Sequence, residues 1–309
     1  MKWESKGIIF SNNQQYNWNK THAQIPTVDI IGADIFRVYY STRDDQNRSY
    51  TSYFDVSATN PSQIIYEHDS YILPLGESGA FDDCGVMPSS ILSKGDDKYF
   101  YYIGWNVRNT IPYYLSIGLA IQEESESSFR KFGNGPVLGR NLYEPYLCST
   151  PFVLYDDSKW HMWYMSGTGF ETIYDRIEPL YDIKYAYSCD GIHWEAKGQA
   201  AIKYKHNKES ICRPCVIKED GIFKMWYTYR SIINYRTDKL KSYRIGYAES
   251  RDGIDWTRLD EAVGINIPDE GWDSQMQAYP YVIAHNNRKY MFYNGNGFGQ
   301  SGIGYAILS

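Results

Sequence analysis

Two segments of the chain have almost the same form: Ser188–Trp194 reads Ser-Cys-Asp-Gly-Ile-His-Trp, and Ser250–Trp256 reads Ser-Arg-Asp-Gly-Ile-Asp-Trp. In both, Asp-Gly supplies the positive φ that a tight turn needs, and the tryptophan begins the strand after the turn. Each segment comes after an aromatic strand that ends in Met-Trp-Tyr, at Met162–Tyr164 and Met225–Tyr227. The chain therefore repeats a structural unit, and the repeat decides the fold.

The repeat extends through the whole chain. A proline in front of an apolar strand recurs at a spacing of about 63 residues. These prolines are Pro26, Pro88, Pro151, Pro214 and Pro280. A polar turn and a second strand that ends in tyrosine follow each proline, which is the pattern of a hairpin. Third strands are expected at Ile117–Ala120, Ile183–Ala186, Ile245–Ala248 and Ile303–Ala306.

Five units of four strands predict an all-β fold, a five-bladed β-propeller formed by one domain over residues 1–309. The last unit ends at Ser309, after its third strand, and Trp3–Phe10 resembles the start of a fourth strand at Trp194–Gly198. We therefore expect the N-terminal strand to pair into the last blade and close the ring. An open all-β sandwich is the alternative, but the regular spacing favours the propeller.

The composition restricts the classes of partner. Of the 309 residues, 43% are hydrophobic, 22% are charged and 17% are aromatic, as expected for a folded protein rich in strands. The net charge of −6 and the lack of a long basic stretch argue against a nucleic-acid partner or a membrane partner. No targeting segment is visible, so we expect a cytoplasmic protein. No residue set predicts a metal site or a cofactor.

The loops on one face of such a ring carry the candidate site. Residues just before each repeated proline and just after each second strand lie on the same face, around the central opening. The candidate catalytic residues there are the carboxylates Glu144, Asp83 and Asp82. The candidate substrate-binding residues are His22, Gln24, Arg43, Asp44, Trp105, Arg108, Glu209, Arg213, Arg230, Asp273 and Gln277.

Paired carboxylates are what glycoside cleavage requires, because one protonates the leaving oxygen and the other acts as base or nucleophile. We expect Glu144 to be the acid and Asp82 or Asp83 to be the base or an auxiliary carboxylate. A carboxylate before a strand also caps turns, which is the structural alternative. The arginines either neutralise these acids or hold a phosphate, a sugar carboxylate or a nucleotide-sugar diphosphate.

The five units, the Met-Trp-Tyr strands and the Ser-x-Asp-Gly-Ile-x-Trp turns resemble the five-bladed propellers of glycoside hydrolase families 43, 32, 68 and 130. The resemblance covers essentially the whole chain and implies catalytic carboxylates on the first three blades. Asp82 or Asp83 matches the second blade and Glu144 the third. The first blade departs from the pattern, because Thr21–Pro26 contains no carboxylate.

Three functions stay open at this stage, each with a carbohydrate as partner. The first is a glycoside hydrolase-type enzyme that cleaves a glycosidic bond by acid–base catalysis. The second is a phosphorylase or transferase acting on a phosphorylated or nucleotide-linked sugar in surface-polysaccharide metabolism. The third is a sugar-binding propeller without catalysis.

Overall fold

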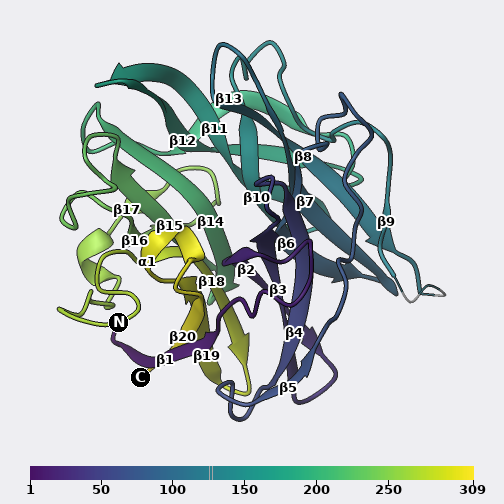
Figure 1. Ribbon diagram of the computed structural model, residues 1–309. Coiled ribbons are helices and arrows are strands. Elements are labelled where there is room, and N and C mark those ends of the chain that lie inside the picture. Colours follow the sequence, from purple (N-terminus) through teal and green to yellow (C-terminus); the bar gives the residue numbers. More distant parts are fainter. Residues whose placement is uncertain (125, 127) are drawn as a thin grey trace.

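The computed structural model describes residues 1–124, 126 and 128–309, and it consists mainly of strands. The strands form antiparallel meanders around a common centre (Figure 1). The first strands of the meanders lie nearest to that centre: β2 (Thr21–Ile31), β6 (Gly85–Lys94), β10 (Cys148–Asp156), β14 (Glu209–Glu219) and β18 (Ala278–His285). The all-β class predicted from the sequence is confirmed.

The remaining strands follow outward in chain order, except that β1 is the outer strand of the last meander. The second strands are β3 (Ile35–Arg43), β7 (Asp97–Val107), β11 (Lys159–Ile173), β15 (Ile222–Ser231) and β19 (Arg288–Asn294). The third strands are β4 (Ser49–Ser57), β8 (Tyr113–Gln122), β12 (Arg176–Ser188), β16 (Arg244–Ser250) and β20 (Ile303–Leu308). The outer strands are β5 (Ile64–Glu67), β9 (Arg130–Lys131), β13 (Glu195–Ile202), β17 (Thr257–Arg258) and β1 (Trp3–Phe10).

Two short helical segments complete the described part of the chain, η1 (Asp260–Ala262) and α1 (Asn296–Gly299). Neither is long or apolar enough to cross a bilayer. The first two meanders share one sheet through a single parallel pair of residues, Ser49 and Gly85. The other meanders form separate four-stranded sheets.

The first strand of the chain belongs to the sheet of its last residues. β1 pairs with β20 in antiparallel register, with Trp3 opposite Leu308 and Ser5 opposite Ala306. The backbone N–H of Ser309 also donates to the carbonyl of Lys2 at 3.0 Å. The edge of β20 is therefore covered by a strand from the other end of the sequence, which removes an open row of backbone groups.

Each repeated Asp-Gly turn lies within one meander and accepts a hydrogen bond from the meander before it. In the first of them, Ser188 Oγ accepts a hydrogen bond from the backbone N–H of Gly191 and fixes the turn. The carbonyl of Gly191 then accepts a bond of 2.6 Å from Tyr101 Oη, which lies on the preceding meander. The carbonyl of Gly253 accepts a bond of 2.7 Å from Trp163 Nε1 in the same way. The motif thus ties each of these turns to the sheet before it.

A β-bulge interrupts each first strand near its repeated proline. The residues in front of four of these prolines, Ile25, Thr150, Arg213 and Tyr279, have positive φ angles between 39° and 57°. This backbone conformation is uncommon for residues other than glycine. Because a bulge redirects the side chains next to it, these residues turn toward the centre on which the first strands converge. The bulges therefore help to shape the site.

Candidate functional site

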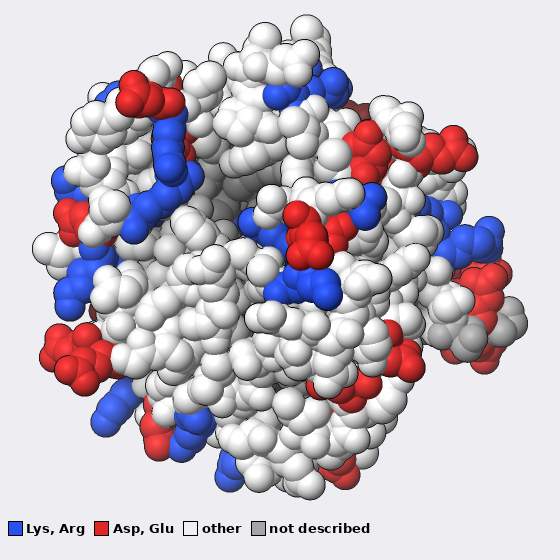
Figure 2. Space-filling model, in the orientation of Figure 1, with Lys and Arg blue, Asp and Glu red and all other residues white. Residues whose placement is uncertain are grey.

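A cavity of about 390 Å³ opens where the first strands converge. Figure 2 shows the hollow near the middle of this face, with Lys and Arg side chains at its rim. Aromatic residues form much of the wall: Trp105, Tyr113, Tyr181, Tyr235, Tyr243, Tyr279 and Phe298. Polar and cationic side chains also line it: Gln24, Arg43, Asn47, Ser49, Ser149, Thr150, Arg230 and Arg236. Within the described residues, no carboxylate lines this cavity.

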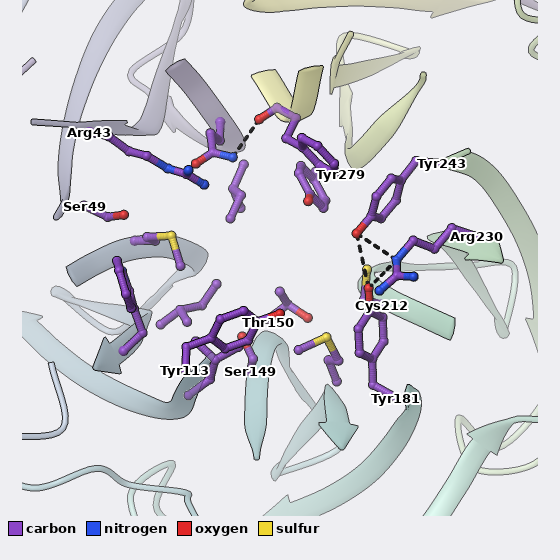
Figure 3. A pocket seen from close by; sticks show the side chains of 18 of the residues that line it. Arg43, Ser49, Tyr113, Ser149, Thr150, Tyr181, Cys212, Arg230, Tyr243 and Tyr279 are labelled. Atoms are coloured by element: carbon purple, nitrogen blue, oxygen red, sulfur yellow. Dashed lines mark hydrogen bonds between the residues drawn. The ribbon is translucent and has the colours of Figure 1, made fainter. Parts of the chain in front are cut away.

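Arg43, the last residue of β3, is a cation without a counter-charge. Its side chain reaches into the cavity (Figure 3), and its Nε is buried without a hydrogen-bond partner. No described carboxylate forms an ion pair with it. Burial and the nearby Arg43 lower the pKa of His22 to about 4, so this imidazole is neutral at physiological pH. A buried charge that lacks partners is costly, and an anionic ligand removes that cost.

Arg230, on β15, approaches the cavity from the opposite side (Figure 3). Its Nε donates to Tyr181 Oη at 2.9 Å and to Tyr243 Oη at 3.1 Å. Its guanidinium carbon lies 3.8 Å from the centre of the Tyr235 ring. These tyrosines fix the position of the guanidinium, but because they are neutral they do not compensate its positive charge.

Arg236 lies between the cavity and a neighbouring groove, and it is the arginine of this wall that has an acidic partner. It forms an ion pair with Glu178, a buried carboxylate on β12. Tyr235 Oη donates to the same carboxylate at 3.0 Å. This network attaches the loop between β15 and β16 to the hairpin of β11 and β12.

Three further polar atoms of the cavity wall are buried without a partner among the described residues. They are Gln24 Oε1, Trp105 Nε1 and Ser149 Oγ. Buried polar groups in folded proteins are normally satisfied, so each exception calls for an explanation. Donors and acceptors of this kind suit the hydroxyl groups of a sugar, and the aromatic side chains supply flat apolar faces beside them.

The predicted catalytic carboxylates lie outside this wall. Asp82 is buried, and it accepts hydrogen bonds from Tyr102 Oη at 3.0 Å and from Lys131 Nζ at 2.7 Å. Glu144 has no exposed surface and contacts Tyr164 and Ser166 as well as Lys184. Asp83 accepts a backbone bond from Gly79 and stabilises a turn. Each of these acids therefore has a structural partner.

The contact between a carboxylate and a repeated tyrosine recurs through the fold. Tyr227 donates to Asp260, and Tyr293 donates to Asp273 at 2.9 Å. These tyrosines occupy the same place in their repeats as Tyr102 and Tyr164, on the second strand of each meander. The corresponding Tyr40 of the first meander has a buried Oη without a partner. The recurring pair attaches the surrounding loops to the sheets.

The candidate binding residues divide into two groups. Gln24, Arg43, Trp105 and Arg230 line the cavity. The others lie elsewhere in the described structure, in contact with other side chains or in the loops around the mouth: His22, Asp44, Arg108, Glu209, Arg213, Asp273 and Gln277. Asp44 binds Arg48 and its own loop, Glu209 accepts two bonds of 2.7 Å from Arg258, and Gln277 donates to Asp273.

Arg213 has a distinct position, because its fully buried guanidinium crosses between three first strands. Nη1 donates to the carbonyl of Ser89 on β6 at 2.6 Å. Nη2 donates to the carbonyl of Pro26 and to Thr27 Oγ1 on β2, at 2.8 and 3.0 Å. Arg213 itself is on β14. It therefore joins strands across the centre, below the residues that line the cavity.

Sequence reasoning missed several residues of the wall. Thr150 and Tyr279 stand directly before repeated prolines, a signal that points to the centre once the bulges are known. Tyr235 and Arg236 belong to the segment Ser231–Lys241, which is longer than a hairpin needs. Tyr181 belongs to the segment Gly167–Asp182, which is also longer than a hairpin needs.

No family model matches the chain. Over 309 residues the chain is 37% identical to Uncharacterized protein MT1551 of Mycobacterium tuberculosis strain CDC 1551, covering 100% of this chain and 99% of the relative. It is 36% identical over the same length to Uncharacterized protein Rv1502 of strain H37Rv. The chain belongs to the family of these two proteins. Over a shorter stretch of 103 residues this member of the Rv1502 family is 31% identical to a β-1,2-mannobiose phosphorylase of Thermoanaerobacter, covering 31% of this chain and 33% of that enzyme.

Solved structures show the fold of this member of the Rv1502 family. A glycoside hydrolase structure matches with a TM-score of 0.72 at 17% identity, covering 98% of this protein and 90% of that one. A thermostable family-43 glycoside hydrolase matches with a TM-score of 0.67 at 16% identity, covering 98% and 92%. The fold is that of the propeller glycoside hydrolases, which confirms the resemblance inferred from the sequence.

Proposed function

We propose that the chain binds a sugar through an anionic group, a phosphate or the diphosphate of a nucleotide-linked sugar, and acts as a phosphorylase or transferase on it. The observation that carries this proposal is the cavity with Arg43 and Arg230 on its wall and no carboxylate among the described lining residues. The partial match to a mannobiose phosphorylase supports the same class of substrate.

The reaction class fits the composition of the wall. In glycosyl transfer the bond from the anomeric carbon to a phosphate oxygen breaks, a bond to an acceptor hydroxyl forms, and the acceptor's proton passes to the phosphate. A phosphate already carries negative charge, so its departure needs less protonation than that of an alcohol. The guanidinium groups of Arg43 and Arg230 are suited to hold that charge. Gln24, Trp105 and Ser149 offer free polar atoms to the sugar hydroxyls.

Thermal melting of the purified chain tests the proposal, with inorganic phosphate, sugar 1-phosphates, nucleotide-linked sugars and neutral oligosaccharides as added ligands. We expect the phosphorylated compounds to raise Tm and the neutral ones to have a smaller effect. Arg43→Gln should remove the phosphate-dependent shift. Arg288→Gln is the matched control, because Arg288 is exposed at the turn between β18 and β19.

An equal response to neutral and phosphorylated sugars contradicts the proposal, and so does a phosphate-dependent shift that survives in Arg43→Gln. Tight binding of a sugar phosphate without turnover, in the presence of a panel of acceptor sugars, favours the non-catalytic alternative. These outcomes separate the role of the cavity from the role of the chain as an enzyme.

Acid–base cleavage of a glycosidic bond is the second candidate, and Asp182 is the observation that favours it. Burial raises the pKa of Asp182 to about 6, with Lys184 and Glu144 next to it. A carboxyl group protonated near neutral pH is what a general acid requires. In this candidate Asp182 takes the acid role that the sequence assigned to its neighbour Glu144, and Asp82 or Asp83 is the base. The candidate requires that these buried acids become accessible from the cavity. The release of sugar from a neutral glycoside tests this candidate. The wild type should release the sugar, and Asp182→Asn and Glu144→Gln should not.

We further propose that the meanders are the five blades of one domain over residues 1–309, closed by β1, and that the protein acts in the cytoplasm. The pairing of β1 with β20 supports closure of the ring. Deletion of residues 1–10 tests it, since β20 then has a free edge. A deletion variant that melts like the full chain contradicts the closure.

A further inference from the structure

The most exposed large apolar side chains of the described chain lie on the face where the cavity opens. Leu142 is 86% exposed, Leu240 82%, Tyr174 74% and Val107 63%, whereas the exposed fraction of every other such side chain described is 51% or less. Leu142 precedes β10, Leu240 lies between β15 and β16, Tyr174 is at the tip of the hairpin of β11 and β12, and Val107 ends β7. These are loops and strand ends of three neighbouring meanders.

We call these four side chains the apolar tips. The loops that carry Val107, Tyr174 and Leu240 also supply residues of the cavity wall or of the groove beside it, and Leu142 precedes β10, a strand whose first residues line the cavity, which places the tips on the face of the mouth. Val107 is followed by the turn to Tyr113, and Leu240 lies in the loop that carries Tyr235 and Tyr243. Arg108 of the β7–β8 turn, Arg176 beside the hairpin tip and Arg236 line one groove next to the cavity. Single exposed leucines are normal on protein surfaces. Here, however, the four most exposed apolar side chains lie on the same face, and this arrangement calls for an explanation.

Cations accompany the apolar tips. Arg108, Arg140, Arg176 and Lys239 are exposed on these loops, and Lys203 is exposed between β13 and β14. None of these five forms an ion pair with a described residue. The acids of the same loops are largely compensated: Glu171 pairs with Lys208, Glu178 with Arg236 and Asp238 with Lys241, which leaves Asp175. In a chain with a net charge of −6, this face has an excess of free positive charge.

We propose that this face docks on an anionic lipid bilayer, with Leu142, Leu240, Tyr174 and Val107 inserted among the headgroups and the cavity mouth turned toward the lipid. Separate protruding side chains among cations suit the bilayer interface, where apolar groups enter one by one and lysines and arginines contact anionic headgroups. A protein partner instead needs a continuous apolar patch with a polar rim. The sequence predicts no membrane partner because these residues are far apart in the chain and meet only in the fold.

Vesicle flotation of the full chain tests the inference, which does not depend on the proposed function. We expect binding to vesicles of phosphatidylcholine mixed with phosphatidylglycerol, weaker binding to phosphatidylcholine alone, and weakening of the former by salt. The variant Leu142→Ser/Leu240→Ser should lower the partition constant at least tenfold, on the order expected from two leucines that no longer enter the interface. Arg176→Gln/Lys239→Gln should weaken binding to the anionic vesicles alone.

The matched control is Ile64→Ser/Ile65→Ser on β5, which is exposed and apolar but pairs with the end of β4 that is distant from the cavity. We expect it to bind like the wild type. All substituted side chains are exposed, so the melting temperature of each variant should stay unchanged and confirm folding. Wild-type chain that does not float with anionic vesicles overturns the inference, as does undiminished binding of the double leucine variant. A wild-type dimer that becomes a monomer in that variant, measured by light scattering, assigns the tips to a second copy and also overturns it.

Discussion

Glu144 Oε2 lies 3.0 Å from Lys184 Nζ, and both side chains are almost completely buried. Tyr164 Oη donates to the other carboxylate oxygen at 2.8 Å, so each oxygen has a partner. The pair holds β12 against the loop before β10. Removal of one member leaves the other charge in a site that water does not reach, and such a loss is strongly destabilising. A substitution of Glu144 therefore affects the stability of the fold as well as any chemistry.

Glu144→Gln is expected to lower the free energy of unfolding by about 3 kcal/mol, because Lys184 loses its counter-charge. Urea denaturation at neutral pH measures the change. The double variant Glu144→Gln/Lys184→Met should recover a large part of the loss, since it removes the orphaned cation. If Glu144→Gln is as stable as the wild type, the ion pair is not a structural element.

Arg43→Gln is expected to raise the free energy of unfolding of the ligand-free protein by about 1 kcal/mol, because a half-buried cation whose Nε lacks a partner is replaced by a neutral group. The measurement is chemical denaturation in a buffer without phosphate or sulfate. Arg288→Gln should leave stability unchanged. A marked loss of stability in Arg43→Gln means that Arg43 has a structural partner, against the arrangement seen in the cavity.

Arg213→Met is expected to destabilise the fold by about 3 kcal/mol or more, since the variant loses charge-assisted bonds to β2 and β6 and leaves buried carbonyls unsatisfied. Thermal and urea unfolding both report it. Arg213→Lys should not restore wild-type stability, because one ammonium group cannot reach acceptors on two strands in the planar arrangement of a guanidinium. Full rescue by lysine argues for a simple charge effect.

The stability contribution of Asp182 should depend on pH. Burial raises its pKa from 3.8 to about 6, so the protonated carboxyl favours the folded state. Its contribution is fully present below about pH 4 and is lost as the pH rises through about 6. Asp182→Asn, which stays neutral, should therefore be more stable than the wild type by about 2 to 3 kcal/mol at pH 8 and nearly equal to it at pH 4. The same difference at both pH values contradicts this assignment.

The sequence predicts the fold class better than the site. The repeated prolines and tyrosines specify strand order, because proline positions and two-residue periodicity are local properties. Whether a loop carboxylate faces the cavity depends on contacts across the fold. Tyr102 and Tyr164 hold Asp82 and Glu144 away from the wall, and nothing local reveals that pairing. Arg43 could be predicted because it directly ends a second strand, at the edge of the opening.

The position of Arg213 has a consequence for the size and shape of what the cavity admits. Its guanidinium bonds to strands on other sides of the centre, so a fixed cation and its acceptors occupy the space among β2, β6 and β14 beyond the residues that line the cavity. A polymer cannot pass through the centre at this level. If the sugar of the proposed function is part of a long glycan, that glycan has to enter the cavity by a terminus and leave through the same mouth.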